Sequence, residues 1–172
     1  MRDIRQENAG FLHGLAALVD RLDTECFTLV LAPAMTASIG AHVRHVHDHY
    51  HALLRDLPTG RIDYENRARD GRLETDRHIA AAELRRMAAL VVNTRELDLE
   101  RRVSVRDGAI AGGSWSHSTL GRELEFLMSH AIHHCSLIAV ACRLQEIGVD
   151  PELGFAPSTL RHLAGMRRAR AC

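Results

Sequence analysis

Mainly apolar residues recur at three- and four-residue spacing in four stretches of this chain, which is the period of one face of an amphipathic α-helix. In the first stretch, residues 3–22, the repeat consists of Ile4, Asn8, Phe11, Leu15, Leu18 and Leu22. The second stretch begins at Thr36 or Ser38, both of a residue type that caps helices, and ends near Asp56, before Pro58. We therefore predict a helix over each stretch.

The second predicted helix differs from the first because its inward face carries histidines. At helical spacing this inward stripe consists of Met35, Ile39, His42, Val46, His49 and Leu53. A third helix is predicted over residues 75–95. Its buried positions are Ala80, Leu84, Met87 and Val91. The fourth and longest helix is predicted from Ser118 or Thr119 to about Ile147, where Gly148 ends it.

The segments between these helices have other patterns. Residues 57–73 are polar and rich in arginine, which predicts a loop. Residues 99–108 alternate between apolar and polar before Asp107-Gly108, which predicts a short extended excursion or a hairpin. Residues 112–115 are predicted to be loop, and the tail from residue 151 has little period.

These elements define the expected fold class. Four substantial helices with short connections predict an all-α protein, a four-helix bundle with a short extended excursion before the last long helix. A chain of 172 residues is long enough for one domain with its own core. We place this single domain at residues 1–163 and predict a disordered C-terminal tail over residues 164–172.

Charge and composition exclude several classes of partner. The 22 basic and 22 acidic residues balance, so no long-range field attracts nucleic acid or an anionic membrane. No stretch approaches the roughly 20 apolar residues of a membrane span, and the first residues lack the apolar run of a secretory signal. Four cysteines without a C-x-x-C pair are typical of reduced thiols. We expect a soluble, cytoplasmic protein that binds neither nucleic acid nor membrane.

Histidine is the unusual residue type in this composition. Of the twelve histidines, eight lie in two short stretches of predicted helix: His42, His45, His47, His49, His51, His130, His133 and His134. His130 and His134 are four residues apart, so they lie on consecutive turns of one helix face and can share a metal ion. Their stripe consists of Glu123, Leu127, His130, His134, Leu137 and Ala141. Imidazoles and a carboxylate on an inward face are costly to bury without a partner, and a metal ion is such a partner.

A further ligand has to come from a facing helix, and the second helix offers several histidines. His42 points inward by helical spacing, His45 lies at the flank of the same face, and His49 is one turn beyond His45. His47 and His51 point away and are predicted to be solvated. The alternative without a metal is a helical scaffold whose histidines satisfy one another by hydrogen bonds.

These residues resemble a known family. Residues 38–50, Ser-Ile-Gly-Ala-His-Val-Arg-His-Val-His-Asp-His-Tyr, resemble the second-helix signature of DinB-like (DinB/YfiT-type) metal-binding four-helix bundles. Residues 129–134, Ser-His-Ala-Ile-His-His, are similar to that family's fourth-helix H-x-x-x-H. Residues 62–69 and 155–160 resemble a subgroup, so the resemblance extends to about residue 163. It implies His45, His130 and His134 as metal ligands, with His42 as a supporting group or substitute ligand.

The resemblance also implies a chemistry. Characterised members of the family include low-molecular-weight thiol transferases and mycothiol-dependent isomerases, and others are regarded as hydrolases. Three protein ligands leave a position open for a thiol or water, which is the catalytic arrangement of a divalent site. We therefore expect a metal-dependent enzyme that activates a small thiol or water for transfer or hydrolysis. The alternative is a non-catalytic stress or sensor protein that binds a metal or a small ligand.

Other residues receive supporting roles in this hypothesis. The expected orienting groups or general bases are Glu123, Asp48 and His49. Tyr64, Arg67 and Arg69 are expected to bind a carboxylate of a thiol cosubstrate, and the alternative is that they belong to a solvated loop. Imidazole ligands suit zinc, iron, nickel or copper, and we expect zinc. The expected partners are a small-molecule substrate and, from the family, a second copy of the chain in a homodimer.

Overall fold

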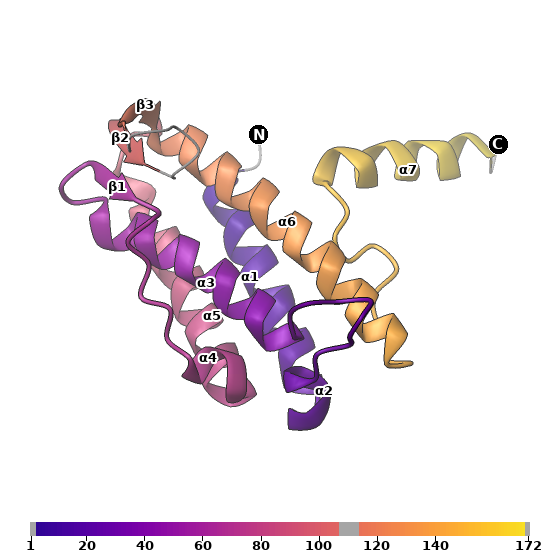
Figure 1. Ribbon diagram of the computed structural model, residues 1–172. Helices are drawn as coiled ribbons and strands as arrows, with labels where there is room; N and C mark the ends of the chain where they lie inside the picture. Colours follow the sequence, from indigo (N-terminus) through magenta and orange to yellow (C-terminus); the bar gives the residue numbers. More distant parts are fainter. Residues whose placement is uncertain (1–2, 107–113, 171–172) are drawn as a thin grey trace.

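Four long helices form the centre of the computed structural model, which describes residues 3–106 and 114–170 (Figure 1). They are α1 (Ile4–Arg21), α3 (Ile39–Asp56), α5 (Arg77–Asn93) and α6 (Leu120–Leu144). At the start of each helix a side-chain oxygen accepts a hydrogen bond from a backbone N–H of the first turn, and these capping residues are Asp3, Ser38, Asp76 and Thr119. The four helices predicted from the sequence are therefore present, with their ends shifted by a few residues.

The shorter elements add a small sheet to the predicted helical fold. The structure adds the helices α2 (Thr24–Thr28), α4 (Arg72–Thr75) and α7 (Pro157–Arg170), the 3₁₀ helix η1 (Thr94–Glu96), and the strands β1 (Arg61–Asp63), β2 (Arg102–Arg106) and β3 (Ser116–Thr119). The protein is thus mostly helical with a small three-stranded sheet. Strand β2 is the extended excursion expected over 99–108, whereas β1 and the start of α4 lie in the predicted loop 57–73. The predicted turn at Asp107-Gly108 falls outside the described residues.

The sheet lies where α3 ends and α6 begins (Figure 1). Strand β1 pairs with β2 in parallel, with Ile62 opposite Val105, and β2 pairs with β3 antiparallel, with Val103 opposite Ser118. Ile62 and Val103 are buried, so the sheet contributes to the hydrophobic core. This pairing holds the segment after β1 close to the first turn of α6. A three-residue strand paired with a distant segment has no local signal, which is why the sequence did not predict it.

The core lies between the four long helices. Helix α1 contacts α5 and α6, and α3 contacts α5 and α6. Leu12, Val46, Leu84 and Leu127 are each 0% exposed, one from each helix. A polar link joins three of the helices, because the Tyr50 hydroxyl donates to Asn8 Oδ1 at 2.6 Å and Asn8 donates to the carbonyl of Leu124 at 3.2 Å.

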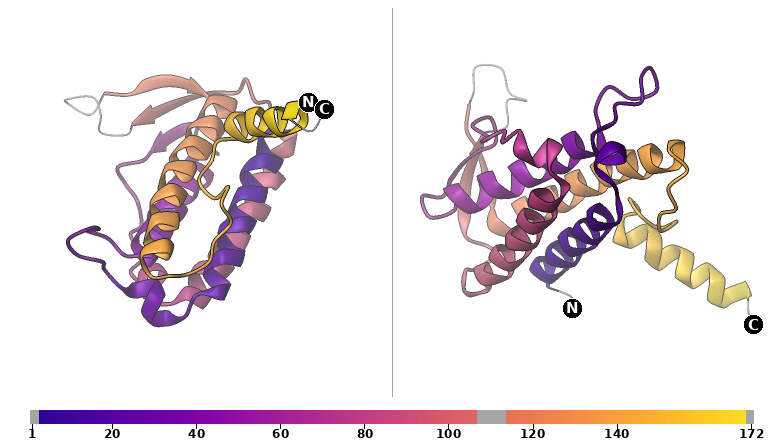
Figure 2. Two further views of the ribbon diagram at one scale, coloured as in Figure 1. Left: turned by 90° about the vertical axis from the view of Figure 1, so that its right-hand side faces the viewer. Right: turned by 90° about the horizontal axis from the view of Figure 1, so that it is seen from below.

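The C-terminal segment differs from its prediction. Helix α7 occupies Pro157–Arg170, which includes residues 164–170 of the tail expected to be disordered. Figure 1 and the right-hand view of Figure 2 show α7 extending away from the four central helices. The domain boundary at residue 163 stays a prediction.

Helix α6 is, within the described ranges, the one helix long and apolar enough to cross a membrane by length and composition alone. The core helix of a soluble protein passes the same test. Helix α6 contacts both α1 and α3 along its buried face, so we assign its apolar character to the core.

Candidate metal centre

The histidines of α3 and α6 meet across the interface between these helices. His45 Nε2 lies 3.1 Å from His130 Nε2, and His42 Nδ1 lies 3.1 Å from His134 Nδ1. Since the earlier residue of α3 faces the later residue of α6, the two helices run antiparallel. Because the histidines on each helix are about one turn apart, they form two neighbouring imidazole pairs across the interface.

His49 joins this group from one turn further along α3. Its Nδ1 donates to the carbonyl of His45 at 2.8 Å, which fixes the tautomer in which Nε2 carries the lone pair. Ligand nitrogens of His45, His49 and His130 all lie within 4.8 Å of one another. A backbone carbonyl that holds one ring nitrogen is the usual support of a metal-bound histidine. His49, expected as an orienting group or base, therefore has the geometry of a ligand.

The three ligands implied by the resemblance are also brought together. The ring centroid of His134 lies 4.5 Å from that of His45 and 4.6 Å from that of His130. His49 is closer still to His130, at 4.1 Å between ring centroids. The structure thus brings His45, His130 and His134 close together with His49 beside them, and their role as metal ligands stays a prediction.

Burial holds these imidazoles in the neutral form that binds metals. Removal from water lowers the pKa of His130 to about 2, that of His134 to about 3 and that of His45 to about 4, and the neighbouring histidines add to each shift. Neutral rings present lone pairs rather than N–H donors to a cation. The cluster is therefore prepared to bind a metal at neutral pH.

The lowered pKa values predict a loss of stability in mild acid for the metal-free protein. In the unfolded chain these histidines take up protons near pH 6.5, whereas in the folded chain they do so only near pH 4 and below. Between these limits the unfolded state binds more protons, so the free energy of unfolding falls as the pH falls. Urea unfolding with a chelator at pH 7.5 and 5.5 should show a lower midpoint at pH 5.5. An equal midpoint would contradict the shifts, and the His130→Ala variant should show a smaller difference.

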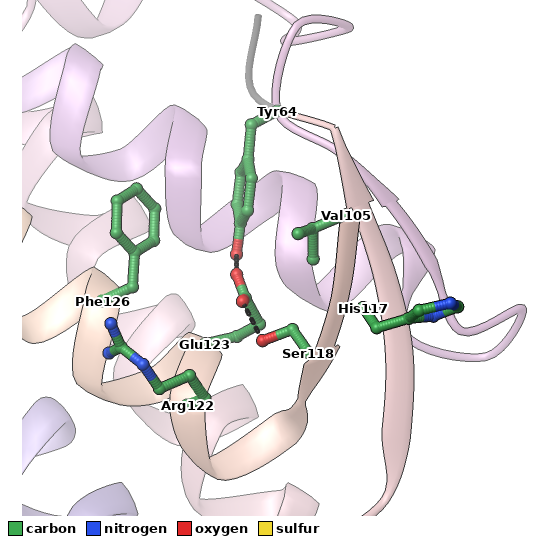
Figure 3. A pocket seen from close by; sticks show the side chains of 7 residues that line it. All are labelled: Tyr64, Val105, His117, Ser118, Arg122, Glu123 and Phe126. Carbon is green, nitrogen blue, oxygen red and sulfur yellow. Dashed lines mark hydrogen bonds between the residues drawn. The ribbon is translucent and has the colours of Figure 1, made fainter. Parts of the chain in front are cut away.

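The predicted residue Glu123 lies in the first turn of α6, beside Tyr64 from the segment after β1 (Figure 3). The Tyr64 hydroxyl donates to Glu123 Oε2 at 2.8 Å, and the Ser118 hydroxyl donates to Glu123 Oε1 at 2.5 Å. The Tyr64 ring also stacks against the His49 ring, with centroids 5.7 Å apart. Tyr64 therefore connects the buried carboxylate to the histidine cluster.

The predicted arginines differ in their placement. Arg67 Nη1 donates to the carbonyl of Tyr64 at 2.6 Å and lies 3.3 Å from His49 Nε2, so it borders the cluster. Arg69 is exposed, with a positive φ of 50°.

The predicted orienting residue Asp48 is buried, and its Oδ1 lies 3.8 Å from His47 Nδ1.

One histidine prediction was wrong. His47 was expected to be solvated, but it is 6% exposed, with Glu83 of α5 at 3.4 Å from its Nε2. The reason is that α3 contacts α5 as well as α6, so both of its faces are covered. His51, on the same face, is half-buried.

The fold resembles a solved structure. A crystal structure of a DinB-like protein, YjoA, from Bacillus subtilis matches with a TM-score of 0.63. The match covers 87% of this chain and 96% of that one, at 18% sequence identity. The chain has a DinB-like fold. No family model matches the sequence, so the DinB-like assignment comes from the arrangement of the helices.

A curated relative matches part of this chain. The sequence is 29% identical over 105 residues to FK506-binding protein 5 of Rhizopus delemar. The match covers 59% of this chain but 27% of that protein, so the chain spans about a quarter of the length of this relative.

Sequence reasoning missed two parts of the candidate metal centre. It gave His49 an orienting role, although the i, i+4 spacing of His45 and His49 is the signal that it used for His130 and His134. It also missed Ser118 and Phe126 beside Glu123, although both lie within five residues of it; only the approach of Tyr64 to Glu123 depends on the path of the segment after β1.

Proposed function

We propose that this chain is a metal-dependent enzyme of the DinB-like superfamily in which histidines of α3 and α6 hold one divalent ion that activates a small thiol or water. The observation that carries the proposal is the convergence of His45, His49 and His130, whose ligand nitrogens lie within 4.8 Å of one another. The DinB-like fold supports the same conclusion independently.

The spacing of the imidazole nitrogens fits a shared ion. Two nitrogens bound at 2.0–2.1 Å with a tetrahedral angle between them lie about 3.3 Å apart. The observed separation of His45 Nε2 and His130 Nε2 is 3.1 Å. His45 and His130 are therefore the proposed central ligands. Two histidines are candidates for the third ligand. The tautomer of His49 and its proximity to the other two favour His49, whereas the resemblance to the family favours His134.

A divalent ion with three protein ligands supplies a Lewis acid with an open position, which lowers the pKa of a thiol or water. Aromatic and basic residues of the chain border the histidine cluster. Phe126 and Tyr64 cover one side, with the Phe126 ring 5.8 Å from the His130 ring. Arg67, beside His49, is placed to attract an anionic group of a substrate. We propose zinc as the ion, and iron, nickel or copper are the alternatives that metal analysis distinguishes.

Metal content and activity test this proposal together. Untagged protein should carry about one equivalent of a divalent metal, and a screen of small thiols with an aromatic electrophile, and of hydrolysable esters, should reveal a rate that chelation removes. The rate should be lost in His130→Ala while the helical circular dichroism remains. If the protein binds metal but shows no such rate, the non-catalytic sensor is favoured. If the protein binds no metal, the remaining interpretation is a helical scaffold whose histidines are hydrogen-bonded to one another.

Separate variants identify the third ligand. His49→Ala and His134→Ala should differ in their effect on metal affinity, because loss of a ligand costs more than loss of a supporting group. Cobalt substitution reports the change directly, since the visible spectrum of the ion depends on its ligands. Equal and small effects of both variants would contradict a site with three histidines.

A further inference from the structure

A small cavity of about 250 Å³ lies beside the metal centre, between β3, the first turns of α6 and the segment after β1 (Figure 3). Its lining includes the carboxylate of Glu123, the hydroxyl of Ser118 and the rings of Tyr64 and Phe126. In the close-up view the Tyr64 hydroxyl and Ser118 approach the carboxylate from two sides, and Phe126 stands on the opposite wall. This combination of a buried carboxylate and two rings needs a chemical explanation.

Two hydrogen bonds hold the carboxylate of Glu123 in place. Each of its oxygens accepts from a hydroxyl, Tyr64 at 2.8 Å and Ser118 at 2.5 Å. A separation near 2.5 Å is typical of a hydroxyl that donates to a charged carboxylate. Both hydroxyls are neutral, so they orient the carboxylate without balancing its charge.

Glu123 is 5% exposed, and a buried charge is costly unless an opposite charge compensates it. Within residues 3–106 and 114–170, Glu123 forms no ion pair with an arginine or a histidine. Arg122 lines the same cavity, but its side chain is 67% exposed and lies 3.7 Å from Glu125, so water screens its charge. The first turn of α6 compensates this charge only in part, through the positive end of the helix dipole, so the cavity keeps a net negative charge on its inner wall.

The two aromatic rings suit a cation in the same place. The centroids of Tyr64 and Phe126 are 5.5 Å apart, with the rings inclined at 54°. The faces of such rings attract ammonium groups, and the attraction grows when water is excluded. We propose that this cavity binds the ammonium group of a small organic ligand, with Glu123 as the counter-ion and Tyr64 and Phe126 as aromatic walls.

The position of the cavity relates this ligand to the metal centre. The Tyr64 ring lies against His49, and the Phe126 ring stacks on His130 at 5.8 Å, so the two rings that line the cavity also contact the histidines. His130 comes seven positions after Glu123 in α6, so the two residues lie about 10 Å apart along the helix axis. A short amine with a thiol or another reactive group at its far end would reach both. This link to catalysis rests on the proposed function, whereas the binding of the ammonium group does not.

Titration with two matched probes tests the cavity directly. We would follow the NMR spectra of metal-loaded and metal-free protein while adding n-butylammonium chloride or 1-butanol, which share a chain but differ in charge. The ammonium probe should bind at least about 10-fold more tightly than the alcohol. Glu123→Gln keeps a side chain of the same shape and should abolish this preference. Glu125→Gln, which removes an exposed carboxylate two residues along α6, should preserve it.

The outcomes separate this proposal from the proposed function. Equal binding of the two probes, or an unchanged preference in Glu123→Gln, would overturn the ammonium site. If Glu123→Gln fails to fold, Phe126→Leu provides the test, because it keeps an apolar side chain but removes the ring and should weaken the ammonium probe more than the alcohol. Equal weakening of the two would also overturn the site. Metal stoichiometry is read independently, so a protein that prefers the ammonium probe but binds no metal loses only the proposed function.

Discussion

Replacing His130 with alanine should lower the affinity for a divalent metal by more than about 100-fold. Loss of a group that only orients a ligand costs 10–100-fold, and loss of a ligand should exceed that range. Among the proposed ligands, substitution of His130 should reduce the metal affinity most, because His130 is central in the cluster. Its Nε2 lies 3.1 Å from His45 Nε2, and its ring centroid lies within 4.6 Å of the ring centroids of His49 and His134. Competition with a chromophoric zinc chelator at pH 7.5 measures the change.

His133 provides the matched control for this experiment. It lies on the same helix, three residues from His130, but its side chain is exposed. His133→Ala should therefore leave the metal affinity within a few-fold of the original value. A similar loss in both variants would mean that the metal binds at the surface of α6, and an unchanged affinity in His130→Ala would remove the proposed centre altogether.

The elements that could be predicted from the sequence are those with a local signal. Helix α3 follows from its apolar period and from the Ser38 cap, and the histidine pair on α6 follows from four-residue spacing within a strong helical pattern. Helix period alone slightly favoured His42 over His45 as the inward histidine. In the structure both face α6, His42 opposite His134 and His45 opposite His130, because the face that α3 presents to α6 is wide enough for both.

The features that could not be predicted depend on contacts between distant segments. The cavity depends on the position of Tyr64, which directly follows β1, a three-residue strand that pairs with β2. Because the paired segments are some forty residues apart, no periodic pattern in the sequence predicts the pairing. His47 illustrates the same limit. A helix wheel gives the angle of its side chain, but only the position of α5 decides whether that angle meets water or Glu83. The clustering of histidines from the two helices could thus be predicted from the sequence, whereas their surroundings could not.

The second large expected effect concerns stability, and it arises where the start of α3 packs closely against its neighbours. Gly40 lies in the first turn of α3, two residues before His42, and a Cβ atom there would overlap the backbone carbonyl of Glu74 in α4 and approach a ring carbon of Phe27 at 2.9 Å. Backbone cannot yield as a flexible side chain does, so α3 or α4 would have to shift. Gly40→Ala should therefore lower the free energy of unfolding by about 2–3 kcal/mol.

The contrast with a second glycine isolates this steric cause. Gly14 lies in the exposed middle of α1, where an added Cβ would meet nothing within 4 Å, so Gly14→Ala should raise the free energy of unfolding by about 0.5–1 kcal/mol through the helix preference of alanine. Urea unfolding of both variants measures the two changes, and a stabilising or neutral Gly40→Ala would contradict the packing of α3 on α4. A displaced α3 also moves His42 and His45 relative to α6. Folded Gly40→Ala protein should consequently bind the metal more weakly than Gly14→Ala protein, which connects the packing at the start of α3 to the geometry of the metal centre.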